Sequence, residues 1–148
     1  MQTPTASRVT GTLLILIGLL GLSVLALDRI LWETAPMHAY GLILFVIIDF
    51  ALSGFVIAKA SRMAFTLAAG WSALRIIIQI GDVLLAPTVG MPYVGFADYL
   101  FNPTAVNPPN PTGVPGTPID LIIILQIIVI WGAWKGRSLT PKVPTSSR

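Results

Sequence analysis

Four polar residues lie on one side of an apolar stretch in the middle of the chain, and they are the residues best suited to chemistry inside a membrane. They recur at intervals of three, four and three residues: Ser72, Arg75, Gln79 and Asp82. At about 100° per residue, this spacing places them on one face of an α-helix. An arginine within a membrane helix costs roughly 2.5–3.5 kcal/mol on insertion scales, so we expect it to have a partner.

The expected partner of Arg75 is Asp49, the one acidic residue in the preceding apolar stretch. Asp49 lies ten residues before Lys59, and Arg75 lies thirteen residues after Arg62. At 1.5 Å per residue, both are about 15–20 Å from the same short connection. Because two lone charges in hydrocarbon are much less stable than one pair, we predict an Asp49–Arg75 ion pair near the middle of the membrane.

Further polar residues extend this centre toward the outer side. Gln79 and Gln126 reach a similar depth, where each amide can bridge helices or solvate the ion pair. An outer rim is expected above them, formed by His38, Asp82 and Asp120. This file of residues is interpreted either as a half-channel, ion site or ligand pocket, or as a polar seam that fixes how the helices pack. The seam is favoured, because only Ser53 and Thr66 continue the file into the cytoplasmic half.

Cofactor chemistry has little support in the composition. His38 is the only histidine and there is no cysteine, whereas a haem held between helices commonly takes two histidine ligands. The rim residues also lack the close spacing of a metal site. We therefore predict no cofactor and no metal, and the few basic residues do not indicate nucleic-acid binding.

The composition is that of a membrane protein. Of 148 residues, 55% are hydrophobic and only 10% are charged, and the mean hydropathy is +0.84. Soluble domains carry about 25% charged residues, so a water-facing surface cannot be built from this chain. We predict one domain, residues 1–148, because the length leaves no room for a separate soluble module.

Four apolar stretches predict the helices that position the polar residues, at about residues 11–32, 36–58, 62–86 and 118–135. Each is near the length of about 20 residues that crosses a bilayer. The second and third are joined by so short a connection that they form a hairpin, and Ser61 is placed to cap the third. The fold class is therefore predicted to be all-α, with four transmembrane helices in an antiparallel bundle.

The first stretch has a second interpretation, as a cleaved signal peptide. Its apolar run is longer than the usual 7–15 residues of such peptides, so a retained helix is preferred. One side of this helix carries residues without large side chains, which allow a neighbouring helix to approach closely. These residues are Gly11, Gly18 and Gly21.

The connection between the third and fourth helices is a long loop, residues 87–117. Eight of the twelve prolines lie between residues 87 and 118, which predicts extended, irregular backbone. Its first part is aromatic, and we expect this part to lie along the membrane surface and to bind a partner. The aromatic residues proposed for this role are Tyr93, Phe96, Tyr99 and Phe101.

The basic residues predict the orientation. With four spans, both termini share a side with nearly all of them: Arg8, Lys59, Arg62, Lys135, Arg137, Lys142 and Arg148. The opposite side holds only Arg29 outside the membrane. By the positive-inside rule, both termini are expected in the cytoplasm of a multi-pass plasma-membrane protein, with the proline-rich loop outside.

Three functions remain open. The favoured one is a non-catalytic accessory or structural subunit of a larger membrane complex, whose partners are the bilayer and other subunits or copies of itself. The alternative is a small homo-oligomeric transporter or proton-translocating protein that uses Asp49 and Arg75. A second alternative is a membrane oxidoreductase or quinone-reactive subunit that uses His38 and the rim carboxylates, although no catalytic residue is identified.

Overall fold

The structure is a computed structural model that describes residues 3–27, 29–34, 36–85 and 117–141. Every regular element in these residues is a helix, and the described part contains no strand. The helices are α1 (Thr3–Leu27), α2 (Arg29–Thr34), α3 (Pro36–Lys59), α4 (Arg62–Leu85) and α6 (Thr117–Leu139). The predicted partner-binding residues Tyr93, Phe96, Tyr99 and Phe101 lie outside the described residues.

Four of these helices are long and apolar enough to span a membrane, which confirms, for the described residues, the predicted all-helical class with four such segments. The spans are Pro4–Leu27, Pro36–Lys59, Arg62–Asp82 and Leu121–Leu139. Each has 19 to 24 residues, close to the length that the hydrocarbon core requires.

The first helix begins at Thr3, well before the predicted start at residue 11. Its polar first turns fold because they pack inside the protein: Ala6, Ser7 and Thr10 are all buried. The predicted segment 11–32 is also divided, since α2 is a separate short helix. Trp32 in α2 folds back on α1 and donates its indole N–H to the carbonyl oxygen of Leu25 at 2.8 Å, which occupies a carbonyl that the helix end leaves without a partner.

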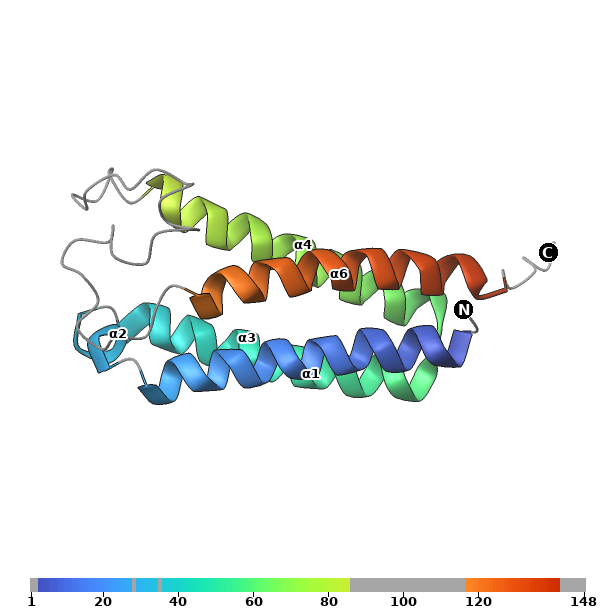
Figure 1. Ribbon diagram of the computed structural model, residues 1–148, viewed down its shortest axis with the longest axis horizontal. Coiled ribbons are helices and arrows are strands. Elements are labelled where there is room, and N and C mark those ends of the chain that lie inside the picture. The colour runs from blue at the N-terminus through green and yellow to red at the C-terminus, as the bar shows by residue number, and fades with distance from the viewer. Residues whose placement is uncertain (1–2, 28, 35, 86–116, 142–148) are drawn as a thin grey trace, which may run out of the picture.

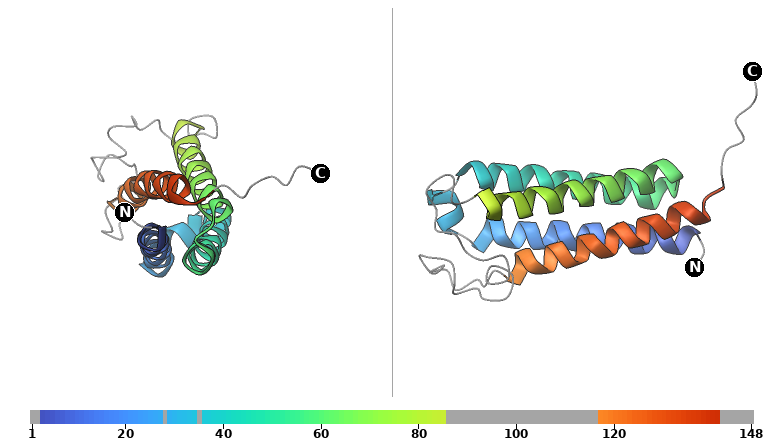
Figure 2. Two further views of the ribbon diagram at one scale, coloured as in Figure 1. Left: turned by 90° about the vertical axis from the view of Figure 1, so that its right-hand side faces the viewer. Right: turned by 90° about the horizontal axis from the view of Figure 1, so that it is seen from above.

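The four long helices lie side by side, and the start of α1 is at the same end as the end of α6 (Figure 1). Helix α1 packs extensively against both α3 and α6, and α4 packs mainly against α6. Although α3 and α4 are consecutive, they touch least among these neighbouring pairs. The end-on view shows the resulting order around the bundle, α3, α1, α6 and α4 (Figure 2).

Small residues bring α1 against α3, as the sequence predicts. A Cβ added to Gly11 would overlap the side chain of Ile57, and one added to Gly21 would lie 2.6 Å from Val46. Ser53 on α3 donates its hydroxyl to the carbonyl oxygen of Gly11 at 2.9 Å. Such a bond across helices requires the two backbones to be close, so the glycines are packing positions.

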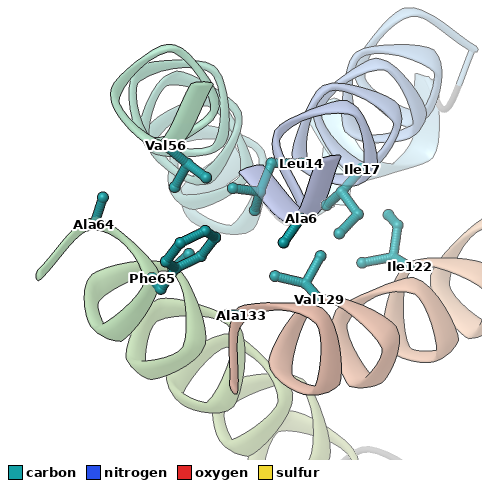
Figure 3. Close-up of a cluster of buried hydrophobic side chains, with 10 residues drawn as sticks. Ala6, Leu14, Ile17, Val56, Ala64, Phe65, Ile122, Val129 and Ala133 are labelled. Atoms are coloured by element: carbon teal, nitrogen blue, oxygen red, sulfur yellow. The ribbon is translucent and has the colours of Figure 1, made fainter. Parts of the chain in front are cut away.

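The apolar core lies where α1, α3, α4 and α6 converge, and Figure 3 shows Phe65 reaching from α4 toward side chains of the other helices. Its members include Leu14, Val56 and Val129, all fully buried. Gly136 on α6 leaves room for the Phe65 ring, because an added Cβ would overlap that ring. The α4–α6 contact therefore depends on a small residue facing a large one.

The connection between α3 and α4 contains the predicted cap. The hydroxyl of Ser61 accepts the backbone N–H of Ala64 at 3.2 Å, which confirms Ser61 as the N-cap of α4. Ala60 has a φ of 45°, and its N–H bonds the carbonyl oxygen of Val56 at 3.0 Å. A left-handed residue at this point is the usual way in which a helix ends and the chain turns back.

Substituting Gly136→Ala is expected to destabilise the protein by about 1–3 kcal/mol, because the added methyl group forces the buried Phe65 ring out of its position. The matched control is Gly54→Ala, where an added Cβ meets nothing within 4 Å. That control should be neutral or slightly stabilising, since alanine is the better helix former by up to about 1 kcal/mol. The measurement is thermal unfolding of both variants in the same detergent. Equal stability of the two variants would contradict the close α4–α6 packing.

Candidate functional site

The polar centre joins α3 to α4 in the middle of the two helices. Nη1 of Arg75 donates a hydrogen bond to Oδ2 of Asp49. The indole N–H of Trp71 donates to the other carboxylate oxygen, Oδ1, at 2.7 Å. Asp49 and Arg75 are each 0% exposed. The carboxylate is therefore bonded through both oxygens and shielded from the surroundings of the helices.

Phe45 completes this arrangement from α3. The guanidinium carbon of Arg75 lies 5.1 Å from the centre of the Phe45 ring, a cation–π contact. The same ring meets Trp71 edge-on, with 5.5 Å between the ring centres. We call Phe45, Asp49, Trp71 and Arg75 the α3–α4 clamp. On each helix its two members are four residues apart, so they lie on one face.

Phe45 and Trp71 were not predicted as members of the site from the sequence. A signal was present, because each aromatic residue precedes a charged residue by four positions. A buried indole N–H also needs an acceptor, and Asp49 is the one carboxylate within the neighbouring span. Spacing alone does not distinguish Trp71, because aromatic residues are common in apolar helices without any polar role.

Gln79 and Gln126 do not bond to the ion pair in the part of the chain that the structure describes. Gln126 is buried, and neither its Oε1 nor its Nε2 has a hydrogen-bond partner there. The same is true of Oε1 of Gln79, Oγ of Ser72, and Nε and Nη2 of Arg75. Burying one such group without a partner lowers the stability of the folded state by roughly 1–3 kcal/mol. These polar atoms, in the clamp and beside it, can form further hydrogen bonds.

These groups on α4 and α6 share one depth. Phe65 on α4 lies against Gly136 on α6. Arg75 lies ten residues after Phe65 on α4, and Gln126 lies ten residues before Gly136 on α6. Each is therefore about 15 Å from that contact along its helix, at 1.5 Å per residue. The unpartnered amide of Gln126 and the free nitrogens of Arg75 are therefore on the same level of the bundle.

Of the predicted outer rim, two residues are near each other. Nε2 of His38 lies 3.9 Å from Oδ2 of Asp82, and their side chains are 60% and 59% exposed. At this distance and exposure the contact is weak. Asp120 belongs to the first turn of α6, and its side chain lies outside the described part. Among the residues that the structure describes, no three His, Asp or Glu side chains gather closely enough to hold a metal.

On the other side of the clamp, two polar side chains donate to backbone carbonyl oxygens. Ser53 bonds to the backbone of Gly11, and Thr66 bonds to the carbonyl oxygen of Arg62 in its own helix. Thr10, which was not predicted as a site residue, is buried, and its Oγ1 has no partner among the described residues. Two surface hollows of the described part are lined by other residues. The clamp contains a buried charge pair and can orient helices, but both oxygens of its carboxylate already accept a hydrogen bond.

No protein family, curated protein sequence or solved structure matches this chain. The activity has therefore to be inferred from the chain's own side chains. What they present is an enclosed ion pair, a neighbouring set of unpartnered polar atoms and four apolar helices.

Substituting Asp49→Asn is expected to destabilise the folded protein by about 3–5 kcal/mol, because Arg75 is then buried without its counter-charge. The control is Asp82→Asn, which removes an equally charged but exposed carboxylate and should change stability by less than about 1 kcal/mol. Chemical unfolding in mixed micelles measures both. A loss for Asp49→Asn as small as that of the control would show that the clamp does not hold the helices together.

Proposed function

We propose that the four long helices cross the plasma membrane as an antiparallel bundle with both termini in the cytoplasm. The basic residues support this orientation, since those near the ends of the spans gather where α1 and α4 begin and where α3 and α6 end. The proposal is also supported by the position of the start of α1 and the end of α6 at the same end of the helices (Figure 1).

Within the membrane, we propose that the protein is a non-catalytic accessory subunit of a larger complex, which packs through its helices. The observation that carries this proposal is that both buried charges, on Asp49 and Arg75, bond to partners inside the chain. The α3–α4 clamp uses the reactive groups of the spans to fix the position of α4. What remains for recognition is the apolar outer surface of the helices, with large exposed side chains such as Ile47, Ile77 and Ile127.

This proposal has a consequence for the chemistry of the clamp. If Asp49 and Arg75 serve only to hold helices together, an apolar pair of similar volume can replace them. Replacing a buried ion pair in this way is often neutral or stabilising by about 1–4 kcal/mol. A protein that moves protons or ions through the pair does not tolerate the same replacement, because the charges are its working parts.

The test is a pulldown of the tagged full chain from its native membranes in a mild detergent, followed by mass spectrometry. We expect other membrane proteins to co-purify in a fixed ratio. The same partners are expected with the double variant Asp49→Leu, Arg75→Met, while Asp49→Asn alone lowers the yield of the complex. Recovery of the chain alone, or only with copies of itself, would contradict the accessory-subunit proposal.

A homo-oligomeric transporter or proton-translocating protein is the second candidate. It is favoured by the polar atoms without partners beside the clamp, on Ser72, Arg75, Gln79 and Gln126. Such atoms bind water or a polar solute. For this candidate, vesicles that contain the purified protein should take up protons faster than protein-free vesicles, and the double variant should abolish the difference. The third possibility, a quinone-reactive subunit, stays a prediction that rests on His38 and the rim carboxylates.

A further inference from the structure

A basic hollow lies between the beginning of α4 and the end of α6. It has a volume of about 160 Å³ and is lined by Arg62, Trp134, Arg137 and Ser138. Arg62 is the first residue of α4, and Arg137 lies in the last turn of α6. Two helices thus contribute one arginine each to the lining of the same hollow.

No acidic residue in the neighbouring segments of the chain balances the positive charges of this hollow. The sequence contains no acidic residue in positions 1–27, 50–81 or 121–148, which cover this end of all four long helices. Lys135, next to Trp134, adds a third positive charge, with its ammonium 5.2 Å from the centre of the indole ring. Like charges that line one hollow repel each other, and an anion bound between the two arginines reduces that repulsion.

The chemistry of the lining fits a phosphate group. A guanidinium presents a rigid fork of N–H donors that matches the oxygens of phosphate. The Ser138 hydroxyl donates to the carbonyl oxygen of Lys135 at 2.7 Å, so the N–H donors to the anion come from the arginines. The exposed Trp134 indole is a side chain that prefers the level of the lipid headgroups.

The surface next to the hollow is suited to a hydrocarbon chain. Large exposed apolar side chains follow one face of α6 from the hollow toward the middle of the helix, at spacings of three and four residues: Ile124, Ile127, Trp131 and Trp134. An anion that sits in the hollow and carries an acyl chain therefore has apolar surface to lie along. A free phosphate ion makes no use of that surface.

We propose that this hollow binds the phosphate of an anionic phospholipid, with Arg62 and Arg137 as its ligands and the outer face of α6 as the seat of an acyl chain. Basic pockets between transmembrane helices are known to hold such headgroups. The bound lipid bridges α4 and α6 at the membrane surface. The site is independent of the accessory-subunit proposal, since it requires no protein partner.

The test uses the purified full chain in detergent and native mass spectrometry after incubation with equal amounts of phosphatidylglycerol and phosphatidylcholine. The unmodified protein is expected to retain phosphatidylglycerol preferentially. In the double variant Arg62→Gln, Arg137→Gln, this preference for phosphatidylglycerol over phosphatidylcholine should fall roughly 30-fold, which is about fivefold for each basic residue. The matched control is Arg8→Gln, an exposed arginine of α1 outside the hollow, which should keep the preference.

Two further measurements keep the outcome decisive. The charge-preserving variant Arg62→Lys, Arg137→Lys should bind at an intermediate level, because it retains charge but loses the fork; gel filtration establishes that each variant is folded. Inorganic phosphate is added as a competitor. Displacement of the lipid by equimolar phosphate would overturn the lipid assignment in favour of a free-anion site. Equal loss of preference in Arg8→Gln, or no preference in the unmodified chain, would overturn the site itself.

Discussion

A charged pair inside apolar helices imposes the constraint on which the arrangement of α3 and α4 depends. Neither Asp49 nor Arg75 can be left alone in a low-dielectric interior, so the two helices must keep these side chains in contact. Trp71 occupies the second carboxylate oxygen, and Phe45 covers the guanidinium. A few directional contacts thus connect α4 to α3, whereas α4 packs mainly against α6. A broad apolar interface between the two helices is not required.

The other helix pairs are held in a different way. Glycines on α1 let α3 approach until a serine hydroxyl reaches the opposite backbone, and Gly136 accommodates the Phe65 ring between α4 and α6. Lipid offers no hydrophobic force that would drive helices together, so such close packing and interhelical hydrogen bonds have to supply the association energy. The bundle combines extensive small-residue contacts around α1 and α6 with the α3–α4 clamp on its remaining side.

The sequence was most informative where a simple geometric rule applied. Length and hydropathy predicted the four apolar helices, Ser61 was recognised as a cap, and counting residues from the α3–α4 turn placed Asp49 and Arg75 at nearly equal depth. The start of α1 was predicted too late, because the apolar run begins only at Gly11, whereas the helix begins at Thr3 and buries the polar Ser7 and Thr10. The partner of Trp71 and the missing bonds of Gln126 depend on side-chain directions across helices, which residue spacing on one helix does not determine.

The most direct test of the clamp is an exchange of its charges. Asp49→Arg alone buries two positive charges together and Arg75→Asp alone buries two negative ones, so each single variant should yield little folded protein. Combining them restores one charge of each sign at the same contact. The account predicts that the double variant recovers much of the folded, monodisperse protein in gel filtration, although not all, because the Trp71 N–H would then face an arginine. A double variant no better than the poorer single variant would contradict the claim that this ion pair holds α3 and α4 together.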